Sequence, residues 1–185
     1  MKIIKNRLIM VKDKEIEFET IKNVSSVYKF LIEKLELDKE PEEVAVMLAL
    51  DNKLNIVSCC DISRGDLSTA MLNPREVYKR ALLSNAKGII IAHNHPSGEC
   101  EPSVEDQLIT NQLKEAGNMI GIDLYDHIIV GNEKYYSFFE ENPKLIKEIP
   151  YKKEFYKKCN KEKTERRVDL WQIENLLINL RTIYV

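Results

Sequence analysis

The chain has 185 residues, of which 44% are hydrophobic and 31% are charged. This length and composition exclude a disordered or fibrous protein and predict one core-forming domain with an appendage. No apolar run is long enough to cross a bilayer, and basic residues interrupt 1–15, so we expect neither a membrane segment nor a secretory signal. The four cysteines include no C-x-x-C pair, which favours a reducing, cytoplasmic setting.

Charge is distributed unevenly along the chain, although the formal net charge is only −2. Residues 151–185 contain nine Lys or Arg against five Asp or Glu, whereas 1–150 contain 19 basic and 25 acidic residues. The bulk charge does not favour nucleic-acid binding by the whole chain, and the composition changes near Pro150. We expect three segments, namely a hairpin and helix over 1–41, the main domain over 42–140 and a basic, helical extension over 141–185.

The first half of the chain alternates apolar runs with turn and capping residues. The predicted elements are a hairpin of 2–10 and 15–20, a helix from Ser25 or Ser26 to about 37, a buried strand over 43–50 and a returning strand over 54–60. Residues 51–53, Asp-Asn-Lys, are typical of a turn between those two strands.

The second half begins with a strong helix signal, because Asn73 can cap a helix and Pro74 suits the first helical position. That helix is predicted to end near 86. The elements after it are a strand over 88–93, a loop over 94–102, a helix from Ser103 to 116–117, strands over 122–130 and 134–138, and a helical tail whose part over 168–180 is amphipathic. This order predicts an α+β or mixed α/β fold.

The residues with the strongest chemical signal lie between 93 and 106. His93 and His95 are two residues apart at the end of a predicted strand, so their side chains point to the same side. Asp106 follows Ser103 by three residues, in the first turn of the next predicted helix. A strand end and a helix start joined by a compact loop can meet at one point. Two imidazoles and one carboxylate are a typical zinc set that leaves a fourth position for water.

Ser103 and Asp106 also fit an ordinary capping box, in which the acid only accepts hydrogen bonds from helix amides. The residues leave this alternative open for Asp106, but two of the chain's three histidines fall in the pattern, which favours the metal site. The third, His127, is interpreted as a structural residue or as a group behind the ligands. Cys100 is interpreted as a free loop thiol.

The spacing H-x-H-x7-S-x2-D over 93–106 resembles the JAMM signature of MPN+/JAB metallopeptidases. The segment A-H-N-H-P-S-G over 92–98 is similar in particular to the RadC-like bacterial branch. Further motifs that resemble this branch are I-S-R-G at 62–65, P-R-E-V at 74–77 and D-H-x-x-V-G at 126–131. The resemblance covers about 43–140.

The resemblance implies a JAB/MPN-like mixed β-sheet flanked by helices, with one Zn²⁺ per chain held by His93, His95 and Asp106. It also implies that Glu43 acts as general base on a water molecule and that Ser103 hydrogen-bonds the developing oxyanion. The implied activity is hydrolysis of an amide bond in a peptide or protein substrate by a metallopeptidase or isopeptidase. From the residues alone, Glu43 is a carboxylate at the head of a buried strand, and Glu42 is its immediate rival.

Two other functions are alternatives. A zinc nucleobase deaminase would use H-x-E with a downstream P-C-x-x-C, whereas this chain has Asn-His at 94–95 and no C-x-x-C. A non-enzymatic or DNA-associated RadC-like module would carry a structural or degenerate metal site, closed by a fourth protein ligand such as Cys100. The basic tail is a candidate for weak contact with nucleic-acid phosphates, although its interspersed acids favour a solvated helix.

Overall fold

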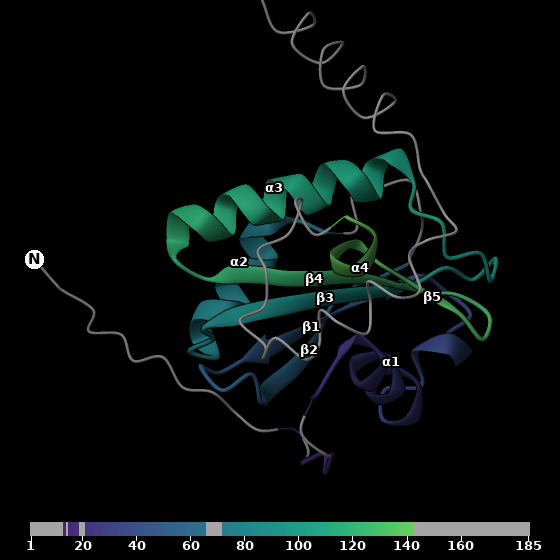
Figure 1. Ribbon diagram of the computed structural model, residues 1–185, viewed down its shortest axis with the longest axis horizontal. Coiled ribbons are helices and arrows are strands. Elements are labelled where there is room, and N and C mark those ends of the chain that lie inside the picture. Colours follow the sequence, from purple (N-terminus) through teal and green to yellow (C-terminus); the bar gives the residue numbers. More distant parts are fainter. Residues whose placement is uncertain (1–12, 14, 19–20, 66–71, 143–185) are drawn as a thin grey trace, which may run out of the picture. The chain divides into compact units, whose positions relative to one another are not determined.

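The computed structural model describes residues 13, 15–18, 21–65 and 72–142, all within one unit of the chain, 1–149. These residues form a five-stranded sheet with the strand order β2-β1-β3-β4-β5 (Figure 1). The strands are β1 (Val44–Leu50), β2 (Ile56–Arg64), β3 (Gly88–Asn94), β4 (Asp123–Val130) and β5 (Tyr135–Ser137). Strands β3 and β4 are parallel and the other neighbouring pairs are antiparallel, so the sheet is mixed.

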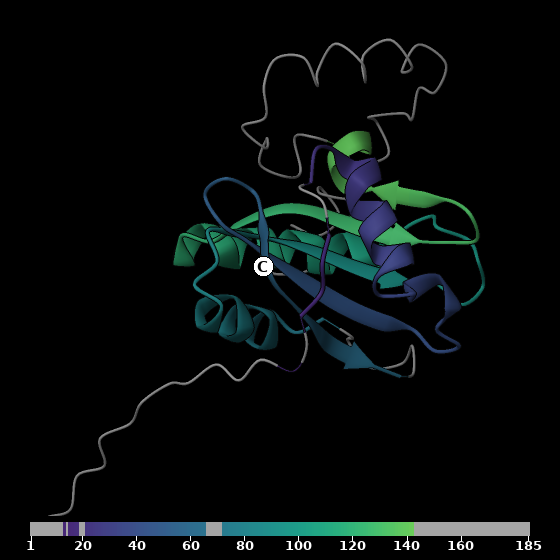
Figure 2. The ribbon, with the colours of Figure 1, turned by 90° about the horizontal axis from the view of Figure 1, so that it is seen from below.

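Helices lie on both faces of this sheet. They are α1 (Val24–Glu33), the 3-10 helix η1 (Leu37–Lys39), α2 (Pro74–Leu83), α3 (Val104–Ile120) and the short α4 (Phe138–Glu141). Helices α2 and α3 cover one face, and α1 crosses the other face (Figures 1 and 2). The predicted fold class, a JAB/MPN-like mixed sheet flanked by helices, is confirmed for the described residues.

The central strands explain why the sheet needs helices on both sides. Every residue of β1, β3 and β4 is buried, as expected for strands covered on both faces. Strand β1 is wholly apolar, whereas β3 and β4 also bury polar residues that include His93 and His127. Alternate residues of β1 and β3 pack with Val77 of α2 and Leu113 of α3 in one core. Helix α3 also supplies the crossover that a parallel pair such as β3 and β4 requires.

Two predicted helix starts are confirmed, and one is corrected. Asn73 caps α2 with Pro74 behind it, and Ser103 caps α3. Helix α1, however, is capped by Asn23, and Ser26 is the third helical residue, whose hydroxyl accepts from the amide of Asn23 in a capping box. A predicted cap at Ser25 or Ser26 was therefore wrong by two or three residues, because both residues are compatible with the first helical turn. The helix also ends at Glu33 rather than near 37.

Helix α3 continues beyond the predicted stop at 116–117 and ends at Ile120. Gly117 lies inside the helix, at a position where only a glycine fits. A Cβ there would lie 2.4 Å from both Tyr78 Oη and the carbonyl oxygen of Ile122. The glycine that ends the helix is Gly121, whose φ of 81° suits a left-handed C-cap. Gly117 therefore marks close packing against α2.

Several predictions concern residues that the structure does not describe. The predicted strand over 2–10 and the tail over 151–185 lie outside the described residues, so the boundaries at 41/42 and 140/141 and the tail's role stay predictions. Residues 15–18, the described part of the predicted second hairpin strand, have no regular secondary structure. Among the described helices, none has both the length and the apolar character needed to cross a membrane.

Candidate metal centre

Three elements meet at one end of the sheet, where β3 ends, β1 begins and α3 begins (Figure 1). Antiparallel pairing sets Ala45 of β1 opposite His93 of β3, which brings Glu43 close to the histidines. The loop after β3 then returns the chain to the start of α3, where Asp106 lies in the first turn. Glu43, His93 and Asp106 are all buried although each is polar or charged.

The predicted ligands lie within reach of a single ion. His93 Nε2 is 3.0 Å from His95 Nε2 and 3.2 Å from Asp106 Oδ1, and His95 Nε2 is 3.7 Å from Asp106 Oδ2. Ligand atoms of a tetrahedral zinc with bonds near 2.0–2.1 Å would lie about 3.3–3.4 Å apart. Electron-rich atoms at these separations repel one another unless a proton or a cation lies among them. The donor set and its spacing therefore fit zinc.

The outer nitrogen of His95 has an unambiguous partner. His95 Nδ1 is 2.7 Å from the carbonyl oxygen of Glu99, and because a carbonyl only accepts, Nδ1 carries the proton. In the neutral ring Nε2 then keeps its lone pair and faces the other ligands, which is the arrangement that metal-binding histidines commonly show. The interaction with Asp106 raises the pKa of His95, against the opposite effect of burial.

Asp106 takes part in the capping box and contacts the histidines as well. Its Oδ2 accepts from the Ser103 amide at 2.8 Å and from Ser103 Oγ at 2.6 Å, and its own amide donates to Ser103 Oγ at 3.0 Å. Burial pushes the pKa of Asp106 upward, but interactions with His93, His95 and Ser103 outweigh burial and hold it well below its ordinary value. Asp106 is therefore a helix cap that also contacts both histidines, and its role as a metal ligand stays a prediction.

Glu43 has the surroundings expected of a base beside a metal site. Its Oε1 is 3.8 Å from His93 Nε2, and its Oε2 is buried without a hydrogen-bond partner among the described residues. Burial raises the pKa of Glu43, and the nearby histidines lower it to a smaller extent. The rival Glu42 is exposed. The unpaired oxygen beside the ligand nitrogens fits the presence of an additional ligand such as water.

Asn94 holds Glu43 in place, a role that the sequence analysis missed. Asn94 lies between the two histidines on β3, so its side chain points to the opposite side of the strand. Its Oδ1 accepts from the Val44 amide at 2.8 Å, and its Nδ2 donates to the carbonyls of Glu40 and Glu42 at 3.2 and 3.0 Å. The sequence contained a signal for this role of Asn94. Side chains alternate along a strand, so the residue between two histidines faces the other side of the sheet, and a buried polar side chain there needs hydrogen-bond partners.

His127 lies behind His93 in the core and is fully buried. Its Nε2 is 2.9 Å from His93 Nδ1, on the ring side opposite to the nitrogen that faces His95. Taken with one ligand atom per residue, two groups of three lie close enough to hold an ion, Glu43–His93–His95 and His93–Asp106–His127. Each contains two of the three predicted ligands, and the predicted set itself is supported by the pair distances given above. We interpret His127 as a hydrogen-bond partner of His93, because it contacts Nδ1 of that ring, whereas the nitrogen of His93 that faces His95 and Asp106 is Nε2.

The motif around Asp126 supplies one wall for His127. Asp126 accepts hydrogen bonds from Ser137 Oγ at 2.6 Å and from the Phe139 amide at 2.9 Å, which connects β4 to the start of α4. Between these two residues, Phe138 stacks on the His127 ring with a centroid distance of 5.1 Å and an interplanar angle of 9°. In the D-H pair of the sequence motif, His127 supplies the imidazole, and Asp126 holds the segment whose Phe138 ring stacks on that imidazole.

Cys100 is a free thiol in the loop before α3, as expected, and it is buried in the core cluster. It belongs to neither metal-compatible group among the described residues, and burial raises the pKa of its thiol. Ser103 directs its one hydroxyl proton to Asp106 Oδ2, so donation to an oxyanion requires that hydrogen bond to be exchanged. The oxyanion role of Ser103 stays a prediction.

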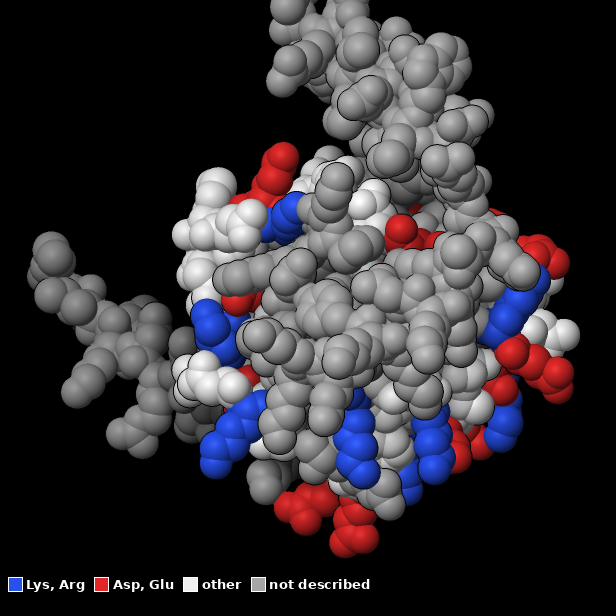
Figure 3. Space-filling view, viewed as in Figure 1, with Lys and Arg blue, Asp and Glu red and all other residues white. Residues whose placement is uncertain are grey.

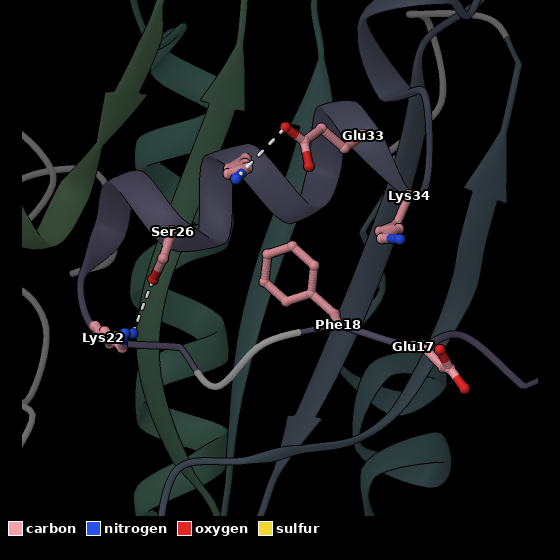
Figure 4. Close-up of a pocket in the computed structure, with 7 residues that line it drawn as sticks. Glu17, Phe18, Lys22, Ser26, Glu33 and Lys34 are labelled. Carbon is pink, nitrogen blue, oxygen red and sulfur yellow. Dashed lines mark hydrogen bonds and ion pairs between the residues drawn. The ribbon is translucent and has the colours of Figure 1, made fainter.

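A groove of about 510 Å³ lies between α1 and the segment of Glu17 and Phe18 (Figure 4). The ring of Phe18 packs edge-on against Phe30 of α1 at 5.0 Å. Charged groups on the helix are exposed and paired locally, as with Lys29 and Glu33 at 3.7 Å. The groove is lined by none of the predicted ligands and gathers no set of buried polar groups, so we do not assign a function to it.

The surface also bears on the nucleic-acid alternative. On the face in Figure 3, the described Lys and Arg side chains are interspersed with Asp and Glu side chains. Binding to a phosphate backbone is favoured by a gathering of positive charge. The described side chains that are visible in Figure 3 therefore form no single gathering of positive charge, and the predicted contact through the basic tail stays a prediction.

Comparison with known proteins agrees with the fold. Residues 21–144, about two thirds of the chain, match the family described as RadC-like JAB domain. A UPF0758 protein of Thermotoga maritima is 40% identical over 123 residues, covering 66% of this chain and 54% of that protein. A UPF0758 protein of Clostridium beijerinckii is 46% identical over 105 residues, covering 57% and 46%.

A third relative, a UPF0758 protein of Clostridioides difficile, is 42% identical over 120 residues, covering 65% of this chain and 50% of that protein. The chain thus spans about half the length of the curated relatives it matches. The names of these relatives state no activity. The matched region contains the whole described sheet and all of the candidate ligands. The chain therefore belongs to the RadC-like JAB domain family.

Proposed function

We propose that the domain is a zinc-dependent hydrolase that cleaves an amide bond in a peptide or protein, as a metallopeptidase or isopeptidase of the JAMM type. The observation that carries the proposal is the convergence of His93, His95 and Asp106, with the unpaired Oε2 of Glu43 beside them. A zinc ion bound there would supply Lewis acidity, lowering the pKa of a water from about 15.7 to about 7 and polarising a carbonyl.

The chain's own residues would perform the proton transfers. Glu43 lies 3.8 Å from His93 Nε2 and has a raised pKa, so it can accept a proton from the attacking water and return it to the leaving amine. Its burial beside the ligands excludes bulk water from the carboxylate. Ser103 would stabilise the oxyanion once its hydroxyl leaves Asp106 Oδ2. A JAB domain is a fitting scaffold, because the superfamily includes metallohydrolases.

The test combines metal content with hydrolysis. Wild type and Glu43→Gln are expected to carry one zinc per chain by elemental mass spectrometry, and His95→Ala is expected to carry none. Wild type should cleave a peptide library that contains both α-amide and Lys ε-amide bonds, with products identified by mass spectrometry, and His95→Ala should not. Glu43→Gln should lose about 10²–10⁴-fold in rate, because it keeps the shape of Glu43 but cannot accept the proton.

Full hydrolysis by Glu43→Gln would eliminate Glu43 as the base. Zinc that is retained without cleavage by wild type would favour the non-enzymatic alternative with a structural metal. Wild type without a stoichiometric divalent metal, purified without chelators, would refute the metal centre itself.

A further inference from the structure

The two histidines of the metal centre differ in the groups behind them. His95 donates its outer N–H to a backbone carbonyl, which settles its tautomer. His93 instead meets a second imidazole, because its Nδ1 lies 2.9 Å from His127 Nε2. A neutral imidazole can donate or accept at either nitrogen. The direction of this hydrogen bond decides whether His93 Nε2 carries a lone pair for a metal or a proton that excludes one.

Thr110 of α3 determines that direction. Thr110 Oγ1 is 2.5 Å from the carbonyl oxygen of Asp106 and 2.6 Å from His127 Nδ1. The carbonyl can only accept, so the single hydroxyl proton of Thr110 is used there. Thr110 Oγ1 must then accept from His127 Nδ1, and in the neutral ring His127 Nε2 is left as an acceptor. His93 Nδ1 is consequently the donor to His127 Nε2, and His93 Nε2 keeps its lone pair.

We infer that Thr110 and His127 are positioning residues, which hold His93 in the tautomer whose Nε2 lone pair faces the metal. The positioning role rests on the proposed function, because it requires a metal at His93 Nε2. The direction of the hydrogen bonds follows from the described contacts alone. Because Asp106 supplies the carbonyl at the far end, the chain of hydrogen bonds begins and ends on two of the predicted ligands.

Burial makes this chain of hydrogen bonds effective. Thr110 and His127 have no exposed surface, and the exposed fraction of His93 is 1%. Water therefore cannot replace a missing partner, and a reversed hydrogen bond would leave a buried group unsatisfied. The stacked ring of Phe138 limits rotation of His127.

The first experiment measures the tautomers in the zinc-free full chain. The chain has three histidines, so long-range proton–nitrogen spectra of the nitrogen-15-labelled protein contain three imidazole patterns, assigned with His95→Ala. We expect neutral His127 to be protonated at Nδ1 and unprotonated at Nε2, and His93 to be protonated at Nδ1. A proton on His127 Nε2 would overturn the inference, whether or not the protein binds zinc.

The second experiment uses a matched pair at Thr110. Thr110→Val keeps the shape but removes the acceptor for His127 Nδ1, so His127 should move its proton to Nε2 and His93 should become protonated at Nε2. Zinc affinity, measured by competition with a chromophoric chelator, should then fall about 10–100-fold. Thr110→Ser retains the hydroxyl and should keep both the wild-type tautomer and the wild-type affinity.

Outcomes of the two experiments separate this inference from the proposed function. An unchanged tautomer and unchanged zinc affinity in Thr110→Val would overturn the positioning role. If Thr110→Val does not fold, the tautomers measured in wild type still decide the direction of the hydrogen bonds between Thr110, His127 and His93. If wild type shows the expected tautomers but binds no zinc, the metal centre fails and the hydrogen-bond chain stands.

Discussion

Helices α1 and α3 begin with the same kind of capping motif, but the two motifs differ in what their side chains contact. Each starts with a reciprocal capping box, formed by Asn23 and Ser26 in α1 and by Ser103 and Asp106 in α3. In α1 both partners stay at the surface and bond only to neighbouring residues, as at 2.8 Å between the Ser26 amide and Asn23 Oδ1. In α3 the acid is buried and its Oδ1 lies 3.2 Å from His93 Nε2.

The difference shows that a capping box does not exclude a second role for its acid. A carboxylate has two oxygens, and in α3 one of them accepts from Ser103 while the other faces a histidine. The box fixes the rotamer of Asp106 through bonds within one turn. It therefore preorganises the carboxylate for contacts that come from a distant strand. In α1 no histidine lies opposite the box among the described residues, so capping is the whole function we assign.

Asp106→Asn is expected to have the largest effect on zinc content, and it tests whether the box at α3 has a role that the box at α1 lacks. The amide oxygen can still accept from the Ser103 amide, so the helix cap should largely survive, with a change in unfolding free energy of about 1 kcal/mol or less. The negative ligand is lost, however, and stoichiometric zinc should disappear from the purified protein. Elemental analysis and chemical denaturation of the same sample check both statements. Retained zinc would mean that Asp106 acts as a cap only.

An intermediate effect is expected for Ser103→Ala. The loss of the N-cap should cost about 1 kcal/mol of stability, and the loss of the hydrogen bond from Oγ to Asp106 Oδ2 should weaken zinc binding about 10-fold. Hydrolysis should fall further, by about 10²–10³-fold, if the hydroxyl also serves the oxyanion. Titration with a competing chelator and rate measurement at saturating zinc separate the two losses. A rate equal to wild type under saturating zinc would remove Ser103 from the chemistry.

The smallest effect is expected for Asn23→Ala in α1. The substitution removes an equivalent cap and should cost about 1 kcal/mol, measured by chemical denaturation. Zinc content and hydrolysis should match wild type, because the described hydrogen bonds of the box at α1 are all with neighbouring residues and none is with a predicted ligand. A parallel loss of zinc would show that the two capping boxes are coupled and that the comparison does not hold.

Much of the site was predictable because its key residues are close in sequence. The spacing of His93, His95, Ser103 and Asp106 was sufficient to predict convergence, since a strand end, a short loop and a helix start allow few arrangements. Asn73 with Pro74 and Ser103 identified two helix starts correctly. The cap at Asn23 was missed because Ser25 and Ser26 offered equally good local candidates. The choice between them depends on where the apolar face of α1 meets the core, with Val24 and Val27 buried.

Residues that act through distant neighbours were not predictable in the same way. Thr110 is an ordinary helix residue in sequence, and its hydroxyl gains importance only because His127 of β4 lies 2.6 Å away. Gly117 resembled a helix stop, and only the contact with Tyr78 explains it as a packing position. Asn94 was overlooked between two histidines, although it holds the backbone beside Glu43.

The difference between the features that the sequence predicted and those that it did not has a physical reason. Local patterns of apolar, capping and turn residues predicted most of the strands and helices, and the short spacing of the histidines and the acid predicted that these side chains lie close together. The sheet order and the parallel pairing of β3 with β4 decided everything that depends on long-range contact. These include the burial of Glu43, the dual use of Asp106 and the direction of the hydrogen bonds behind His93, because donors and acceptors far apart in the chain acquire partners only when the sheet forms.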